Sequence, residues 1–138
     1  MEILYYTRTH NILTPNPAIR WLSAEEYEIF REHLELCGQR ACGEAKWRAA
    51  YSEGATYCGL FVAGQMVARA CVERYSVNAW ELADVRTAKP YRGNGYASQV
   101  CAFALAHILA QGRTATIRTE EDNAAMRQVI KKLGFTEL

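Results

Sequence analysis

Apolar positions in the first part of the chain repeat at helical spacing. Ser23-Ala24-Glu25-Glu26 has the form of a capping box, in which a serine oxygen and a glutamate three residues later satisfy free amides at a helix start. Apolar residues then follow every three or four positions, at Tyr27, Phe30, Leu34 and Cys37, before Gly38. The pattern predicts a helix after Ser23 and a second over residues 44–51, with Gly54 after it.

The middle of the chain favours strands instead. Residues 57–62 and 66–73 are rich in β-forming side chains, and Ala63-Gly64-Gln65 between them predicts the tight turn of an antiparallel hairpin. A third strand is predicted over residues 80–87. Two short strands, 3–7 and 19–22, precede all of this, on either side of a loop at 11–18 that contains two prolines.

Helix and strand alternate in the last third. Residues 96–110 predict a helix that ends before Gly112, and residues 114–119 predict a strand. A final helix carries apolar residues at i, i+3, i+4 and i+7, and Gly134 supplies a left-handed stop. The order β-α-α-β-β-β-α-β-α-β, counted with the extra N-terminal strand set apart, predicts a mixed α/β fold with helices on both faces of one sheet.

Composition narrows the class of protein. A chain of 138 residues, 50% hydrophobic and 22% charged, predicts a single globular domain over 1–138. A net charge of +1 without a long basic run does not indicate nucleic-acid binding. The N-terminus lacks a signal-peptide pattern and the apolar stretch near 100–110 is too short for a bilayer, so we expect a cytoplasmic protein without membrane contact. Five cysteines and three histidines show no metal-ligand spacing, and we expect the cysteines to be buried filler in a reducing compartment.

The most informative segment is Tyr91-Arg92-Gly93-Asn94-Gly95-Tyr96-Ala97-Ser98, between a predicted strand and a predicted helix. Two glycines spaced by one residue allow several amide N–H groups to point into one hollow, and the helix start adds its positive end. This predicts an anion site suited to a pyrophosphate, with Arg92 as an added charge. An ordinary glycine turn is the alternative. A dinucleotide fingerprint, with Glu120 as its acidic residue, is disfavoured because a hairpin precedes the loop and only 18 residues follow Glu120.

Arg92-x-x-Gly95-x-Ala97 resembles the [Q/R]-x-x-G-x-[G/A] motif of the GNAT superfamily of acetyltransferases. Asn123-x-x-Met126, followed by Lys132-Leu133-Gly134-Phe135, resembles that family's last helix, and the segment from Ile19 to Glu26 resembles its first strand and helix. The resemblance covers about residues 18–138, which makes 1–17 an N-terminal extension. It implies a GNAT-like fold and acetyl-coenzyme A as acyl donor.

The resemblance also implies which residues bind the donor. Backbone amides of the glycine loop would hold the pyrophosphate, and the strand before it would pair with the pantetheine arm as an added strand. The last helix would line the donor from the other side, although its asparagine also suits a helix cap. The residues concerned are Val85, Arg86, Thr87, Arg92, Gly93, Asn94, Gly95, Tyr96, Ala97, Ser98, Asn123 and Met126.

Acyl transfer to an amine needs a group that accepts the amine's proton. Glu81 lies where the histone-modifying branch of the family carries its general base, and Asp84 is the second candidate. Strand alternation puts these two carboxylates on opposite faces unless the strand is distorted. Many family members carry a tyrosine seven residues after the asparagine, as acid for the leaving thiolate. This chain has Ile130 there, so coenzyme binding is better supported than catalysis.

Two further expectations concern the sheet and the acceptor. Residues 2–7, or a partner chain, would fill the sheet position next to the last strands. Several aromatic residues either line an acceptor pocket or belong to the core: Trp21, Trp47, Tyr51, Tyr57 and Trp80. The sequence thus predicts an N-acetyltransferase, a monomer or homodimer, that acts on a primary amine of a small molecule or peptide. A non-catalytic acyl-coenzyme A binding or sensing module is the alternative.

Overall fold

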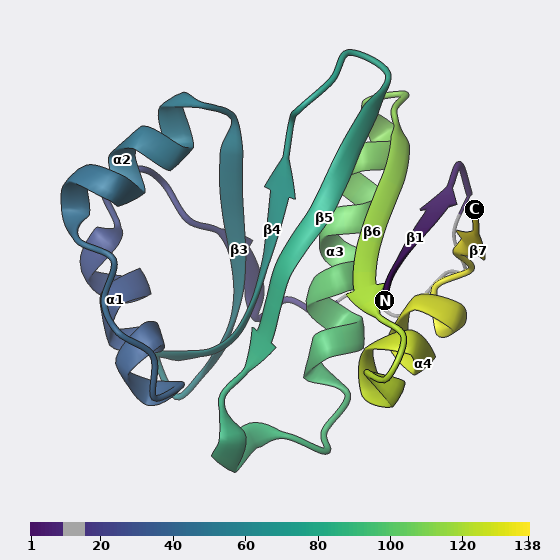
Figure 1. Ribbon diagram of the computed structural model, residues 1–138. Coiled ribbons are helices and arrows are strands. Elements are labelled where there is room, and N and C mark those ends of the chain that lie inside the picture. Colours follow the sequence, from purple (N-terminus) through teal and green to yellow (C-terminus); the bar gives the residue numbers. More distant parts are fainter. Residues whose placement is uncertain (10–15) are drawn as a thin grey trace.

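In the computed structural model, which describes residues 1–9 and 16–138, the strands form one mixed sheet (Figure 1). The order is β2-β3-β4-β5-β6-β1-β7, and every described pair is antiparallel except β5 and β6. The bounds are β1 (Glu2–Thr7), β2 (Ile19–Trp21), β3 (Ala55–Val62), β4 (Gln65–Glu73), β5 (Ala79–Thr87), β6 (Thr114–Glu120) and β7 (Thr136–Glu137).

Helices cover both faces of the sheet and enclose two apolar clusters. α1 (Tyr27–Leu36) and α2 (Glu44–Ser52) pack on β4 and β3, around Phe30 and Trp47. On the other face lie α3 (Tyr96–Ala110) and α4 (Ala124–Lys132), and Figure 1 shows α3 behind β5. α3 fully buries Val100, Cys101, Ala104, Leu105 and Ile108. Because this helix is packed so completely, the loop that leads into it is held on a rigid element.

The predicted order of elements is confirmed, with corrections at element ends. The hairpin turn is only Ala63 and Gly64, both with positive φ (+51° and +80°), and Gln65 already belongs to β4. α1 begins at Tyr27. Glu26 accepts a hydrogen bond from the Ser23 backbone N–H (2.9 Å), but no side chain caps the helix, so only half of the predicted capping box forms. Of the predicted loop at 11–18, residues 11–15 lie outside the described residues.

The expectation that the cysteines are buried filler is correct for three of the five. Cys58, Cys71 and Cys101 are buried, whereas Cys37 and Cys42 are partly exposed. The exceptions follow α1 and precede α2, in a surface connection that sequence periodicity does not resolve.

β5 separates from β6 halfway along its length. The two strands pair only from Ala79 opposite Thr114 to Leu82 opposite Ile117, so residues 83–87 have β4 on one side alone. Along this stretch Arg69 lies opposite Arg86 and Cys71 lies opposite Ala83. β5 therefore contains one residue more than β4 between these two pairs. Such an extra residue is a β-bulge, which re-aims side chains and leaves backbone groups unpaired.

The N-terminal strand lies between β6 and β7 (Figure 1). β1 pairs antiparallel with β6 over its whole length and with β7 at two positions, which confirms that residues 2–7 fill the sheet position predicted for them. None of the helices in the described ranges has the length and apolar character that crossing a bilayer requires.

Candidate functional site

A cavity of about 620 Å³ lies between the end of β5, the glycine loop and α4. It brings together eleven of the residues predicted to bind the donor, all except Asn94. Tyr91, Ala125 and Val129 also line it, although the sequence did not assign them to donor binding. Val129 could have been found, because it follows Met126 by three residues on the same helical face. The predicted carboxylates Glu81 and Asp84 do not line this cavity.

The glycine loop is a cradle of free backbone donors. Gly93 and Gly95 have φ of +85° and +76°, a backbone conformation that L side chains rarely adopt. Within the described part of the chain, no backbone N–H from Gly93 to Ser98 donates to an acceptor. Six consecutive unpaired N–H groups at the start of a 15-residue helix form an anion-binding site.

The strand beside the loop also carries unsatisfied groups. On the edge away from β4, residues 83–87 have no strand partner among the described strands. Their backbone can therefore pair with an extended arm on that edge. The Thr87 hydroxyl lines the cavity, is buried and has no hydrogen-bond partner. A buried hydroxyl without a partner costs free energy, which a bound polar arm would recover. The residues therefore fit a coenzyme A molecule whose pyrophosphate lies at the loop.

Polar side chains stiffen the walls of this cavity. The Arg92 guanidinium donates through Nε to the Thr87 carbonyl oxygen (3.0 Å), which links the loop to β5. Asn94 donates through Nδ2 to the Tyr91 carbonyl oxygen (3.0 Å), within the loop and away from the cavity lining. Asn123 accepts from the Met126 N–H (3.1 Å) and also lines the cavity, so it is a helix cap that faces the cavity as well.

The bulge turns Asp84 toward the α1–α2 face. Asp84 has φ of +50°, and its carboxylate accepts from the Tyr57 hydroxyl (2.6 Å) and from Arg69 Nη2 (2.9 Å). Glu81 lies opposite Glu73 on β4, and Cys71, two residues before Glu73, lies opposite Tyr57. Glu81 is therefore on the same face of the sheet as Tyr57, to which Asp84 is bonded. Glu81 and Asp84 therefore share a face, and the expectation from simple alternation is wrong because the extra residue resets the period.

Glu81 is already engaged by its neighbours on β6. Its Oε1 accepts from Arg118 Nε (3.0 Å) and Thr116 Oγ1 (3.3 Å), and its side chain is 16% exposed. A third carboxylate, that of Glu73 on β4, lies opposite Glu81 and was not a candidate from the sequence. Partial burial, and then the negative charges of Glu81 and Asp84, raise the pKa of Glu73.

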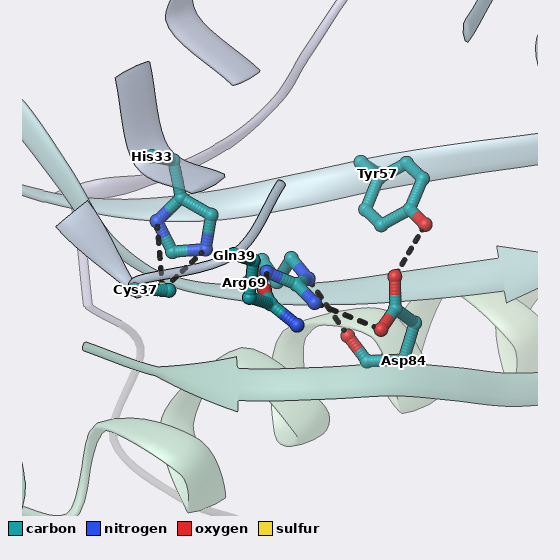
Figure 2. A network of polar contacts seen from close by, with 6 residues as sticks. All are labelled: His33, Cys37, Gln39, Tyr57, Arg69 and Asp84. Atoms are coloured by element: carbon teal, nitrogen blue, oxygen red, sulfur yellow. Dashed lines mark hydrogen bonds and ion pairs between the residues drawn. The ribbon is translucent and has the colours of Figure 1, made fainter. Parts of the chain in front are cut away.

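A second cavity, of about 280 Å³, opens between α1, α2 and the sheet, and Asp84 forms part of its wall. The next residue, Val85, lines the first cavity, so neighbouring residues of the bulge border the two cavities. Figure 2 shows the polar network at this wall, where buried Arg69 joins Asp84 to Gln39 (Nη1 to Oε1, 2.8 Å). Burial and the Asp84 charge raise the pKa of Tyr57, so its hydroxyl stays a proton donor to Asp84.

Of the five aromatic residues that the sequence suggested for an acceptor pocket or the core, two line the second cavity and three do not. Trp47 and Tyr57 line the second cavity. Tyr51 donates its hydroxyl to the Leu22 carbonyl oxygen (2.8 Å), and Trp21 and Trp80 pack against His107 away from both cavities. Aromatic periodicity alone does not separate these roles, because both faces of the sheet carry helices.

Ile130, at the position of the family's tyrosine, is fully buried in the core. It lines neither cavity, and no phenol replaces it on α4, whose sequence contains no tyrosine. The phenols that do line the first cavity are those of Tyr91 and Tyr96, at the glycine loop.

Several solved structures with this fold are described as acetyltransferases. A putative GNAT acetyltransferase from Novosphingobium aromaticivorans superposes with a TM-score of 0.81 at 20% identity, over 99% of this chain and 59% of that one. The ribosomal-protein-S18-alanine N-acetyltransferase of Escherichia coli gives 0.72 at 17% identity, over 87% of this chain and 77% of that one. AAC(6')-Iy, bound to the bisubstrate analogue CoA-S-monomethyl-acetylneamine, gives 0.71 at 17% identity, over 86% and 90%.

At such identities these structures establish the fold alone. The chain spans between 52% and 59% of the length of the first four structures it resembles. No curated protein matches it. Residues 10–135, however, match the acetyltransferase (GNAT) family, whose members are acyl-coenzyme A-dependent N-acetyltransferases. With that match over most of its length and a glycine cradle where the family binds its donor, the chain belongs to the GNAT acetyltransferase family.

Proposed function

We propose that this protein transfers an acetyl group from acetyl-coenzyme A to a primary amine of a small molecule or peptide. The observation that carries the proposal is the row of six unpaired N–H groups from Gly93 to Ser98, beside an open strand edge. The row of N–H groups can bind a pyrophosphate, and the open strand edge can pair with a pantetheine arm. The thioester supplies an activated acetyl group, and the chain binds and orients it.

On this proposal, the amine reaches the acetyl group through the second cavity. Asp84 lines the second cavity and Val85 the first, so a donor that runs along β5 brings its reacting end to the bulge that borders both. There the amine nitrogen bonds to the acetyl carbon, the carbon–sulfur bond breaks, and the amine gives up a proton. Backbone N–H groups at the bulge, where the regular pairing with β4 is interrupted, are suited to hold the carbonyl oxygen as negative charge develops on it.

Asp84 and Glu81 are the two candidates for the group that accepts this proton. Asp84 is favoured because it lines the second cavity and is 45% exposed, whereas Glu81 lines neither cavity and is paired with Arg118. Tyr57 and Arg69 hold the Asp84 carboxylate in one orientation. Either carboxylate acts directly or through a water molecule.

The buried Ile130 favours one alternative, a module that binds acyl-coenzyme A without catalysis. Without a phenol on α4, proton return to the leaving thiolate depends on Tyr96, Tyr91 or water. We also infer a reducing, cytoplasmic setting from the buried free thiols of Cys58, Cys71 and Cys101.

The proposal is tested by calorimetric titration with acetyl-coenzyme A. Gly95→Trp should abolish binding, because its indole would fill the cradle at a position where only Gln99 lies within 4 Å. Gly112→Trp is the matched control, since Gly112 has nearly the same φ (+72° against +76°), has open space around it and follows the other end of α3. That helix spans roughly 22 Å. Binding by the wild type and control, lost in folded Gly95→Trp, supports the donor site.

Turnover then separates the two functions. Release of free coenzyme A in the presence of amines supports the enzyme. Equal affinity for acetyl-coenzyme A and free coenzyme A, without release across an amine panel, supports the binding module. A folded wild type that binds neither would refute both.

A further inference from the structure

Two cations on the second cavity have no partner among the residues that the structure describes. Arg40, between α1 and α2, and Lys46, on α2, both line it and are exposed. Neither makes a hydrogen bond or ion pair with any residue in the ranges 1–9 and 16–138. Nearby cations behave differently: Arg31 on α1 and Arg48 on α2 pair with carboxylates of their own helices. The cations left unpaired in this layer are thus the ones that line the cavity.

The other two charged residues on the cavity wall, Arg69 and Asp84, balance each other. Arg69 is 2% exposed there, and Asp84 matches its charge at 2.9 Å. Since this pair is neutral as a whole, Arg40 and Lys46 leave the cavity with a surplus of positive charge on its exposed side. The cavity therefore carries one carboxylate, that of Asp84, whose neighbour Val85 lines the donor cavity, and two exposed cations.

Apolar side chains form much of the rest of the wall. They come from Phe30 and Leu34 on α1, Trp47 on α2 and Tyr57 on β3. With a volume of about 280 Å³, the cavity lies at the small end of the range for ligand sites, roughly 300–1,000 Å³. This space suits a molecule of amino-acid size.

We propose that the acetyl acceptor is a compact molecule with a primary amine at one end, a carboxylate at the other and an apolar body between them. The amine lies at Asp84, and Arg40 and Lys46 bind the carboxylate. An arginine fork and a lysine ammonium are both suited to such an anion. This inference deepens the proposed function and rests on it for the identity of the reaction.

The first test compares amines that differ only in the carboxylate. 4-(Aminomethyl)benzoate and 6-aminohexanoate are compared with benzylamine and n-pentylamine as acceptors for acetyl-coenzyme A. Each carboxylate compound should have at least about a tenfold higher kcat/KM, through a lower KM, because a charge-assisted hydrogen bond contributes about that factor. Equal kcat/KM within each pair would overturn the inference.

Variants assign the preference to the two cations. Arg40→Gln and Lys46→Gln should each raise the KM for 4-(aminomethyl)benzoate about tenfold and leave that for benzylamine unchanged. Arg48→Gln is the matched control, because it removes a basic residue of the same layer that is paired with Glu44 outside the cavity lining. Equal losses for both substrates, or an equal loss in the control, would contradict carboxylate recognition.

Binding without turnover distinguishes failure of this inference from failure of the proposed function. The four amines are titrated onto the protein saturated with free coenzyme A, where no acetyl group is available. Tighter binding of the carboxylate compounds, lost in an Arg40→Gln, Lys46→Gln double variant, supports the cavity assignment even if no amine is acetylated. Binding without that preference, or no binding of any of the four, overturns it, even if acetyl-coenzyme A still binds.

Discussion

Burial of His33 makes the stability of the fold sensitive to acid. His33 on α1 is 1% exposed, and its Nδ1 lies 2.9 Å from the Met66 carbonyl oxygen on β4, where the neutral ring donates a hydrogen bond. Its Nε2 lies 3.5 Å from the Cys37 sulfur (Figure 2). Burial lowers the pKa of His33 to about 4, assisted by the positive charge of Arg69 and opposed by the bond to Met66.

The magnitude follows from the difference between the folded and unfolded chains. With a pKa of about 4 in the fold against 6.5 for the exposed ring, the unfolded chain takes up a proton first as the pH falls. Stability due to neutral His33 is therefore complete above pH 6.5 and is lost between pH 6.5 and about 4. A gap of about 2.5 pH units at about 1.4 kcal/mol each amounts to about 3 kcal/mol. That is a large share of the roughly 5–15 kcal/mol that stabilises a typical domain.

Urea unfolding of the wild type and His33→Asn at several pH values between 7.5 and 4 measures this loss. The asparagine amide nitrogen can replace Nδ1 as donor to Met66 but cannot titrate. The variant should start less stable, because it packs less well, yet lose about 3 kcal/mol less on acidification. Groups common to both proteins, such as Glu26, whose pKa is lowered by its hydrogen bond to Arg20, cancel in the difference. Parallel loss of stability in the two proteins, at constant m-value, would refute the reasoning.

Three further substitutions test the site and its support. Asp84→Asn should lower kcat about a hundredfold or more and leave the dissociation constant of acetyl-coenzyme A unchanged; a loss found instead in Glu81→Gln would move the general base to Glu81. Gly59→Ala should lower the free energy of unfolding by about 1–3 kcal/mol, because its Cβ would lie 2.4 Å from the Met66 sulfur; an unchanged thermal midpoint would contradict this packing. Glu73→Gln should raise the melting temperature at pH 8, since a raised pKa makes its charge unfavourable in the fold; the gain should vanish below pH 4, and a constant gain would argue against an electrostatic cause.

Local chemistry made much of the fold predictable. α3 was predicted with its observed bounds, because its ends depend on the neighbouring Gly95 and Gly112, both of which have positive φ. The hairpin and the last helix were found for the same kind of reason. The glycine loop was identified as an anion site because its donors come from consecutive residues, so no distant contact is needed to assemble it.

The acceptor side could not be predicted in this way. Its wall joins Phe30, Trp47, Arg69 and Asp84, from four separate elements, and their meeting depends on strand register. The alternation argument failed at Asp84 because a single extra residue in β5, visible only from its pairing with β4, reverses the faces beyond it. Periodicity likewise could not show that Arg40 and Lys46 lack partners within the described ranges while Arg48 has one.

The sequence by itself determined the order of the elements, the glycine cradle and the family resemblance, since each depends on residues close together in the chain. The tertiary structure decided where β5 leaves β6, which face Asp84 takes and which cations are left for a ligand. These depend on pairing between segments far apart in the chain. The energy of that pairing is shared among many contacts, and no short stretch of sequence records it.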